Sequence, residues 1–360
     1  MKDRVGIGII GTGFARNVQI PAFLQCEGAF IASVASGSIT NAQAAADEFG
    51  IEHFTDHWRE TITRPDVDLV CISTPPNLHC EIAVAAFGAG KHVLCEKPMA
   101  MNVAECEQMV AAAAATRRLA LIDHELRFLP GRQKAFQMLH DGSIGRVRHA
   151  KAIFRSPSRI DPNIPWNWWS DAAAGGGALG AIASHVIDTL RWFLGTEIST
   201  VSCLLHSNVK QRPDVAGQMR EVTTDDESNM LLRFAENELT NDATGLVSIS
   251  MVELPDYLNR TEFYGTEGAM RIDHLGELYI AKNGETSWTR IETDLGRPLA
   301  GVYDNGFPRG FLQFAPVLID AIKNNQTHIP YAATFEDGLR IQKVLDAART
   351  SDSNGWMIEL

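Results

Sequence analysis

The stretch VGIGIIGTG, residues 5–13, joins an uninterrupted apolar run to a turn in which two glycines flank a threonine. Short apolar runs without alternation are typical of strands that helices cover on both faces, and residues 14–25 follow with a helical pattern. In such a turn, backbone amides and the positive end of the helix dipole can receive a pyrophosphate. The motif is incomplete because Arg16 replaces its third glycine, and a glycine turn can be purely structural. In this strand, turn and helix context we favour cofactor binding.

The alternation of strands and helices continues to about residue 123. Predicted strands cover residues 5–10, 30–35, 67–73, 92–96 and 119–123, and predicted helices cover 14–25, 40–49, 77–89 and 102–117. Right-handed crossovers through such helices make the strands parallel. Residues 1–123 are therefore predicted to form an α/β domain with a doubly wound parallel sheet.

Beyond residue 124 the pattern changes to longer strands with turns between them. Predicted strands cover residues 147–154, 200–206, 229–234, 245–252 and 260–264, and predicted helices cover 178–194, 309–324 and 334–349. Runs of strands with few interrupting helices are typical of an α+β domain. Residues 124–360 are therefore predicted to form a second domain with an antiparallel or mixed sheet.

Composition excludes several classes of partner and indicates a compartment. The 360-residue chain has a formal net charge of −12, and no basic run offsets it, so we expect neither nucleic acid nor an anionic membrane surface as a partner. No apolar stretch is long enough to span a membrane, and no histidine or cysteine cluster has metal-ligand spacing, so no metal is expected. The six cysteines lack Cys-x-x-Cys spacing, which predicts buried free thiols and a cytoplasmic location.

The end of the second predicted strand bears on the choice of cofactor. It reads ASGS, residues 35–38, without the acidic residue that usually accepts the ribose hydroxyls of NAD. This favours NADP over NAD. A 2′-phosphate also needs a cation, and residues 17–58 contain neither lysine nor arginine. We therefore predict that Ser36, Ser38 and Arg16 surround the 2′-phosphate.

Two more segments follow predicted strands. STPPN, residues 73–77, with His79 just beyond, forms either a wall beside the cofactor or only a stiff turn. EKP, residues 96–98, places Lys97 in the crevice where open α/β sheets bind ligands, so Lys97 can carry a proton beside a nicotinamide ring; the alternative is a surface lysine before a turn proline. The predicted cofactor-binding residues are Gly11, Thr12, Gly13, Phe14, Ala15, Arg16, Ser36, Ser73, Thr74, Pro75, Asn77, His79, Glu96 and Lys97.

In the second half, a glycine triplet at residues 175–177 leads into a helix that carries His185 and Asp188. The spacing of three residues places both side chains on one face of the helix. They can act as a base and a carboxylate, or they can make a structural hydrogen bond.

The stretch PWNWW, residues 165–169, places three indoles just before the glycine triplet. These rings belong either to the core or to a pocket that stacks on the apolar face of a sugar. With His124 and Arg127, they suggest a polar, hydroxylated ligand. The predicted substrate-binding residues are Lys97, His124, Arg127, Trp168, His185 and Asp188.

Taken in order, these motifs resemble those of the glucose-fructose oxidoreductase/inositol dehydrogenase (Gfo/Idh/MocA) family over nearly the whole chain. The matching pieces lie at residues 8–13, 73–79, 92–98, 127–130 and 175–179, followed by His185 and Asp188. The resemblance implies a Rossmann domain followed by an α+β domain with a large open, mainly antiparallel sheet, whose face commonly supports homodimers or homotetramers. It also implies NAD(P)-dependent oxidation of a sugar or cyclitol hydroxyl, or the reverse reduction.

The chain departs from this family at one position. Family members use the lysine of the EKP motif with a histidine and an aspartate four residues before it, and these positions map to Lys97, His185 and Ala181. The leading hypothesis is a dehydrogenase or reductase acting on CH–OH groups, in which His185 accepts the hydroxyl proton and Lys97 stabilises the oxygen. The alternative is a sensor of the same fold that binds cofactor and a polyhydroxylated ligand without turnover, because a carboxylate that orients the pair is missing.

Overall fold

The computed structural model describes residues 3–360, which form two compact units. The first unit comprises the described residues up to Phe128 together with Gly296–Leu339, and the second comprises Leu129–Leu295 and Arg340–Leu360. The sequence predicted one boundary, after residue 123. The chain instead returns to the first unit because helix α8 (Gly306–Lys323) contributes a row of buried side chains to its hydrophobic core.

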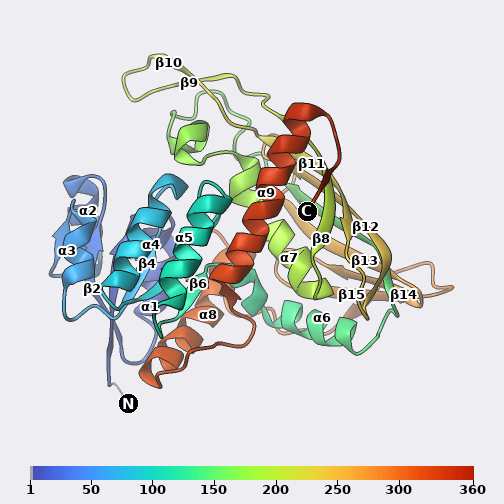
Figure 1. Ribbon diagram of the computed structural model, residues 1–360, viewed down its shortest axis with the longest axis horizontal. Helices are drawn as coiled ribbons and strands as arrows, with labels where there is room; N and C mark the ends of the chain where they lie inside the picture. The colour runs from blue at the N-terminus through green and yellow to red at the C-terminus, as the bar shows by residue number, and fades with distance from the viewer. Residues whose placement is uncertain (1–2) are drawn as a thin grey trace. The chain divides into compact units, whose positions relative to one another are not determined.

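The first unit is built on a seven-stranded sheet with the order β17-β6-β5-β4-β1-β2-β3. Figure 1 labels β2, β4 and β6 of this sheet, with helices beside them. Neighbouring strands are parallel except for β17 beside β6, which confirms the predicted parallel sheet. The strand order reverses at β1, so the carboxyl ends of β1 and β4 border a topological switch point, where such sheets bind ligands. The strands are β1 Val5–Ile10, β2 Ala29–Ala35, β3 Phe54–Thr55, β4 Leu69–Ile72, β5 His92–Cys95, β6 Ala120–Ile122 and β17 Ala333–Thr334.

Helices cover both faces of this sheet, as the unbroken burial of its central strands requires. Two clusters of buried apolar side chains result, one containing Phe23 and Phe311 and the other containing Phe87 and Met109. Asn102 caps its helix by accepting a hydrogen bond from the amide of Glu105. Besides α8, the helices are α1 Ile20–Phe23, α2 Ile39–Phe49, α3 Trp58–Thr63, α4 His79–Gly88 and α5 Val103–Ala114, with a π-helical turn at Ala15–Gln19 and 3₁₀ turns at Pro76–Leu78 and Glu125–Phe128.

The second unit is built on a nine-stranded sheet with the order β16-β15-β14-β13-β7-β12-β11-β8-β18. Only β7 and β12 are parallel neighbours among these strands, so the sheet is mainly antiparallel, as predicted. The strands are β7 Val147–Arg155, β8 Ile198–His206, β11 Glu227–Phe234, β12 Thr240–Ser250, β13 Leu258–Gly265, β14 Gly268–Ile272, β15 Leu278–Lys282, β16 Thr289–Ile291 and β18 Ile358–Glu359. A separate hairpin pairs β9 Gln211–Pro213 with β10 Met219–Glu221.

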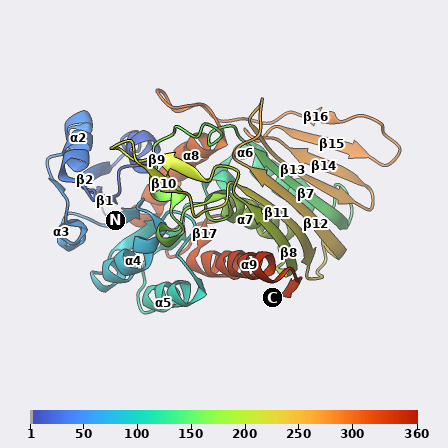
Figure 2. The ribbon, with the colours of Figure 1, turned by 90° about the horizontal axis from the view of Figure 1, so that it is seen from above.

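Helices lie against one face of this sheet and leave the other face open (Figure 2). Phe193 on α7 packs on Phe263 of β13 with ring centroids 5.3 Å apart, and Ser351 on α9 accepts through Oγ the amide hydrogen of Cys203 on β8. The helices of this unit are α6 Pro130–His140, α7 Ser184–Leu194 and the larger part of α9 Phe335–Asn354, with short turns at Trp168–Ser170, Ala172–Ala174 and Leu179–Ala183.

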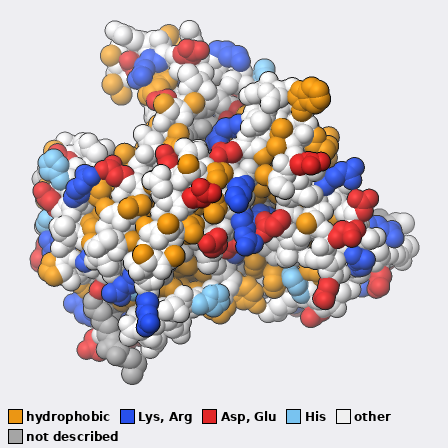
Figure 3. Space-filling view, viewed as in Figure 1, with side chains coloured by type: hydrophobic (Ala, Val, Ile, Leu, Met, Phe, Trp, Pro, Cys, Tyr) orange, Lys and Arg blue, Asp and Glu red, His pale blue; other side chains and the backbone are white. Residues whose placement is uncertain are grey.

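The surface carries charges of both signs. On the face in Figure 3, lysine and arginine side chains are interspersed with aspartate and glutamate. Across residues 3–360, no helix combines the length and apolar character needed to cross a bilayer. All six cysteines are free thiols; five are buried as expected, whereas Cys80 is partly exposed.

Candidate functional site

The glycine turn after β1 lies against the end of β4. Gly11 has a φ of +100°, and a Cβ there would lie 2.3 Å from the carbonyl oxygen of Ser73 and 2.7 Å from the nitrogen of Thr74. Only glycine fits this position. At Gly13, an added Cβ would meet no atom within 4 Å, so the turn is open on that side. The chain continues into the π-helical turn Ala15–Gln19, a conformation that is frequent at functional sites.

The residues predicted to hold a 2′-phosphate only partly assemble. The hydroxyls of Thr12 and Ser36 lie 3.2 Å apart, which brings the ends of β1 and β2 together. Arg16, however, donates from Nε to a carboxylate oxygen of Glu48 on α2 at 2.5 Å. Glu48 therefore offsets the charge that the prediction assigned to the phosphate. Ser38 precedes α2 without a capping hydrogen bond from its side chain.

His79 ties the segment after β4 to the segment after β5. Its two ring nitrogens lie 2.9 Å from the carbonyl oxygen of Thr74 and 3.0 Å from that of Pro98. His79 is completely buried, and this burial lowers its pKa. It therefore positions backbone and presents no surface to a cofactor, unlike its predicted role as a direct contact. Thr74 Oγ1, by contrast, is a buried hydroxyl that has no hydrogen-bond partner within residues 3–360.

Other predicted cofactor contacts differ in exposure. Asn77 is exposed and Pro75 is half-buried, so both have surface available to a ligand. Phe14 packs against the hydrophobic core, and Ala15 is fully buried. These last two residues can offer a cofactor mainly their backbone amides.

A buried polar network lies at the carboxyl ends of β4, β5 and β6; sequence reasoning indicated its Ser73 and Glu96 but missed Gln19 and Asp123. The side-chain amide of Gln19 donates to Glu96 Oε1 at 3.1 Å and to Asp123 Oδ2 at 2.9 Å, and it accepts from Ser73 Oγ at 2.7 Å. Gln19, Glu96 and Asp123 are all buried, whereas Lys97, next in the chain, is partly exposed. The EKP motif therefore leaves its lysine partly exposed directly after β5 and buries its glutamate.

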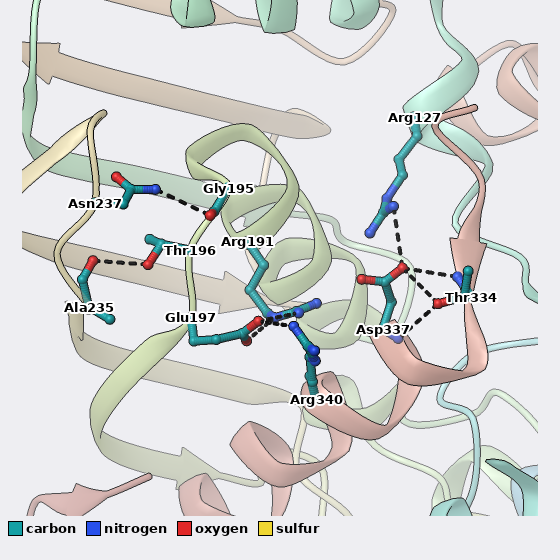
Figure 4. A network of polar contacts seen from close by, with 10 residues as sticks. All are labelled: Arg127, Arg191, Gly195, Thr196, Glu197, Ala235, Asn237, Thr334, Asp337 and Arg340. Carbon is teal, nitrogen blue, oxygen red and sulfur yellow. Dashed lines mark hydrogen bonds and ion pairs between the residues drawn. The ribbon is translucent and has the colours of Figure 1, made fainter. Parts of the chain in front are cut away.

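The predicted substrate residues of the first unit follow β6. His124 is buried, and Arg127 on the adjoining 3₁₀ turn is 5% exposed. Arg127 lies 3.7 Å from a carboxylate oxygen of Asp337, which also accepts the amide hydrogen of Thr334 at 3.0 Å (Figure 4). Asp337 therefore partly offsets the charge of Arg127 at the start of α9, so this charge is not reserved for a ligand.

In the second unit, the glycine triplet packs closely against its own surroundings. A Cβ at Gly176 would lie 2.4 Å from the carbonyl oxygen of Trp169, and Gly177 has a φ of +103°. Asp225, which no sequence motif had indicated, accepts the amide hydrogen of Leu179 at 2.7 Å. Burial raises the pKa of Asp225 to about 6. The triplet and Asp225 together fix the start of the following helical segment.

That helical segment carries the predicted catalytic histidine. Leu179–Ala183 forms a π-helical turn, and α7 begins at Ser184, whose hydroxyl donates to the carbonyl oxygen of Gly180 at 2.6 Å. His185 and Asp188 lie on α7 and are 4% and 2% exposed. Ala181, which the resemblance maps to the family aspartate, is also buried, and its methyl group supplies no charge.

The three indoles have different surroundings within the second unit. Arg220 lies over the ring of Trp166 at 3.6 Å, and Arg159 lies over that of Trp169 at 4.4 Å. Trp168 is 37% exposed, and its ring centroid is 6.3 Å from that of Trp169. Trp168 is therefore the indole with the most accessible face, as a stacking residue requires.

The first unit has the features that a dinucleotide needs. Gly13 leaves space beside a turn at the switch point, and Thr74 Oγ1 offers a buried hydroxyl that a ligand could engage. Ser36 and Asn77 add further polar groups. Over residues 3–360, no group of three or more histidine, cysteine, aspartate or glutamate side chains is arranged to hold a metal ion.

Family models match most of both units. Residues 5–124 match the model described as an oxidoreductase family with an NAD-binding Rossmann fold, and residues 132–271 match the GFO/IDH/MocA C-terminal domain. Both segments agree with the resemblance inferred from the separated motifs.

Individual relatives extend the match to nearly the full chain. Levoglucosan dehydrogenase of Pseudarthrobacter phenanthrenivorans is 32% identical over 78% of this chain and 76% of that protein. Glucose-fructose oxidoreductase domain-containing protein 2 of Xenopus laevis is 31% identical over 99% of this chain and 93% of its own length. A solved structure of levoglucosan dehydrogenase with NADH and levoglucosan has a TM-score of 0.86 and 28% identity, with 99% of both chains covered.

Proposed function

We propose that this chain, which belongs to the Gfo/Idh/MocA family of NAD-binding oxidoreductases, oxidises a hydroxyl group of a sugar or a related cyclic polyol. The similar solved structure of a levoglucosan dehydrogenase with NADH and levoglucosan supports an anhydrosugar or pyranose as the first substrate class to test. When bound, NAD supplies the hydride acceptor for the carbinol carbon.

The observation that carries this proposal is the placement of Lys97. It follows β5 at the carboxyl edge of the sheet, partly exposed, in the unit that also holds the open turn at Gly13. We assign to the Lys97 ammonium the stabilisation of the substrate oxygen, and to His185 the acceptance of the hydroxyl proton. Trp168 would stack on the apolar face of the ring.

Replacement of Lys97 tests this assignment. Lys97→Ala should lower kcat by roughly 10²- to 10³-fold, the usual loss when one group that stabilises charge on a reacting oxygen is removed, and leave NADH affinity within about twofold. Steady-state oxidation of levoglucosan and aldoses would be followed at the nicotinamide band. Lys343→Ala, at an exposed position on α9, is the matched control. Retained turnover in Lys97→Ala would contradict the role of this residue.

We propose NAD rather than NADP as the physiological cofactor. The family model and the similar solved structure with NADH support NAD, and Glu48 offsets the charge of Arg16. The lack of an acidic residue after β2 had favoured NADP. Titration with NADH and NADPH by nicotinamide fluorescence decides between them, and tighter binding of NADPH would overturn this choice.

Ala181 supports a second candidate function, a sensor that binds NAD and a sugar without turnover. A methyl group replaces the carboxylate that other family members place four residues before the histidine. The same measurements separate the two functions. Tight NADH binding without oxidation of any tested polyol would favour the sensor, whereas turnover would exclude it.

We further propose that the open face of the second unit's sheet binds a second copy of this chain. Leu204, Leu231 and Leu246 are 65%, 56% and 38% exposed, and Leu231 pairs directly with Leu246 across β11 and β12. Apolar side chains on adjacent strands of an uncovered face are typical of an interface. Sedimentation equilibrium should give a dimer or tetramer, and Leu231→Asp should lower the mass; a monomeric wild-type protein would contradict the proposal.

A further inference from the structure

We infer that the sugar bound by this protein carries an anionic substituent, a carboxylate or a phosphate, and that Arg159 binds this substituent beside the exposed indole of Trp168. This assignment of a substrate class rests on the function proposed above. Arg159 is a binding residue in this account and takes no part in the transfer of the proton or the hydride.

The Arg159 side chain lies on an indole and has no acidic partner. Its guanidinium carbon is 4.4 Å from the ring centroid of Trp169. Within residues 3–360, this side chain makes neither a hydrogen bond nor an ion pair. A guanidinium carries five N–H donors in a planar fork, and stacking on a ring occupies only its face. Because Arg159 is partly exposed, the donors at the edge of the fork are available to a ligand.

A second arginine adds positive charge beside the first. Arg212, 53 positions further along the chain, is 3% exposed and donates to the carbonyl oxygens of Arg159 and Asp161, each at 2.6 Å. Burial and then the charge of Arg212 lower the pKa of Arg159 to about 10, so Arg159 is still charged at neutral pH. An anion bound to Arg159 would offset the repulsion between the two guanidinium groups.

The carboxylates that attract Arg212 are engaged in other contacts. They belong to Asp226 and Asp161. Both carboxylate oxygens of Asp226 lie 2.9 Å from the amide nitrogen of Asn208, and Asp161 Oδ1 accepts the backbone amide hydrogen two residues further on at 2.9 Å. Within residues 3–360, neither carboxylate forms an ion pair. Arg159 is thus left without a neutralising contact.

The backbone holds Arg159 and its indole in place. The amide of Arg159 donates to the carbonyl oxygen of Met251 at 2.9 Å, and Thr224 Oγ1 donates to the carbonyl oxygen of Trp169 at 3.0 Å. The Trp169 ring centroid is also 6.3 Å from that of Trp168, so the guanidinium and the exposed indole are near neighbours. A sugar ring stacked on Trp168 would bring a substituent within reach of a preorganised cation.

A matched control lies in the same segment. Arg220 is over the ring of Trp166 at 3.6 Å, and within residues 3–360 it also forms no ion pair. Trp166 Nε1 donates to the carbonyl oxygen of Glu221 at 2.9 Å, which fastens this indole to the β9–β10 hairpin. Arg220→Gln therefore removes the same kind of stacked cation from a different indole. If the arginines only stiffen the tryptophan segment, substitutions of Arg159 and Arg220 should have similar effects.

The test compares charged and neutral sugars on the full-length protein by isothermal titration calorimetry. NADH is present at saturation, since it cannot accept a hydride. We expect D-glucuronate or D-glucose 6-phosphate to bind at least about tenfold more tightly than D-glucose, equivalent to about 1.4 kcal/mol. The tighter of the two identifies the anion as a carboxylate or a phosphate. Arg159→Gln should abolish this preference, and Arg220→Gln should leave it within about twofold of the wild type.

Arg159→Lys covers a failure of Arg159→Gln to fold. It keeps the charge but loses the planar fork, so the preference should fall only in part, by about threefold. Equal binding of charged and neutral sugars by the wild type, binding of neither charged sugar, or an equal loss in the Arg159 and Arg220 variants would overturn the inference.

Calorimetry needs no turnover, so this inference and the proposed function can fail separately. Inactivity toward every sugar would count against oxidation, while the preference for a charged sugar would still stand. In an active enzyme, Arg159→Gln should raise KM for the charged sugar about tenfold and leave kcat nearly unchanged, as loss of uniform binding does.

Discussion

The two units each contain a glycine-rich loop that enters a π-helical turn and then an α-helix, yet the glycines serve different purposes. After β1, Gly11 is needed for close approach to the end of β4, while Gly13 faces open space. After the tryptophan segment, Gly176 and Gly177 are both packed against the protein itself. The first loop thus leaves room for a ligand, whereas the second uses its glycines to hold a helix in place.

This difference shows that a glycine motif does not by itself indicate a binding loop. What separates the two loops is the space that a side chain would occupy, and that space is set by segments distant in sequence. Asp225 contacts the second loop from 46 positions beyond Leu179. Substitutions in the two loops test this contrast. Those in the second loop should change the free energy of unfolding, and those in the first loop should change the affinity for the ligand.

The largest effect is expected at Gly176. A Cβ there would lie 2.4 Å and 2.6 Å from two backbone carbonyl oxygens, those of Trp169 and Trp168, so the backbone must move. Gly176→Ala should lower the free energy of unfolding by about 3 kcal/mol, as overpacked positions do. Urea denaturation measures this loss. Gly88→Ala, where an added Cβ meets no atom within 4 Å, is the control and should be neutral or slightly stabilising.

Asp225 makes the stability of the second loop depend on pH. Its pKa is raised from 3.8 to about 6, so the folded state binds this proton more tightly than the unfolded state. The resulting stabilisation is present below about pH 4 and is lost as the pH rises through 6. Asp225→Asn keeps an acceptor for Leu179 and cannot ionise. The free energy of unfolding of Asp225→Asn minus that of the wild type should therefore increase by about 2 kcal/mol from pH 4.5 to pH 8, as measured by urea denaturation. A difference that does not change with pH would contradict this account.

The first loop should respond in affinity instead. Gly13 lies outside the left-handed region and faces open space, so Gly13→Ala should leave the unfolding free energy within about 0.5 kcal/mol of the wild type. The added methyl group occupies the side of the turn proposed for the pyrophosphate. The Kd for NADH should therefore rise about tenfold, equivalent to about 1.4 kcal/mol, by fluorescence titration. A loss of stability with unchanged NADH affinity would show that Gly13, like Gly176, serves packing, and would contradict the contrast between the two loops.

Sequence reasoning succeeded where the signal was local. The apolar runs of β1, β2, β4, β5 and β6 are short, continuous and separated by helical patterns, and the parallel sheet followed from them. It missed β3 and α3 because a two-residue strand and a six-residue helix have too little length to show periodicity. The amphipathic pattern of α8 predicted a helix but could not show which sheet the helix covers.

The same limit applies to the candidate site. Lys97 and the glycine turn could be predicted because short motifs at strand ends carry their own context. Gln19 and Asp123 could not, since they lie 104 positions apart and neither has a local pattern that suggests a buried polar pair. Ala181 could be noticed only as a departure from the family.

The smallest effect concerns Arg16, on the helical turn that follows the first loop. The Arg16 and Glu48 side chains are 40% and 45% exposed, so their ion pair contributes at most about 1 kcal/mol. Glu48→Gln releases the guanidinium, which can then attract a 2′-phosphate beside Ser36. The ratio of NADPH to NADH affinity should rise about threefold, and adding Arg16→Ala to Glu48→Gln should return it to the wild-type value. An unchanged ratio would mean that Arg16 does not reach the phosphate position, in which case Glu48 has no part in the proposed preference for NAD.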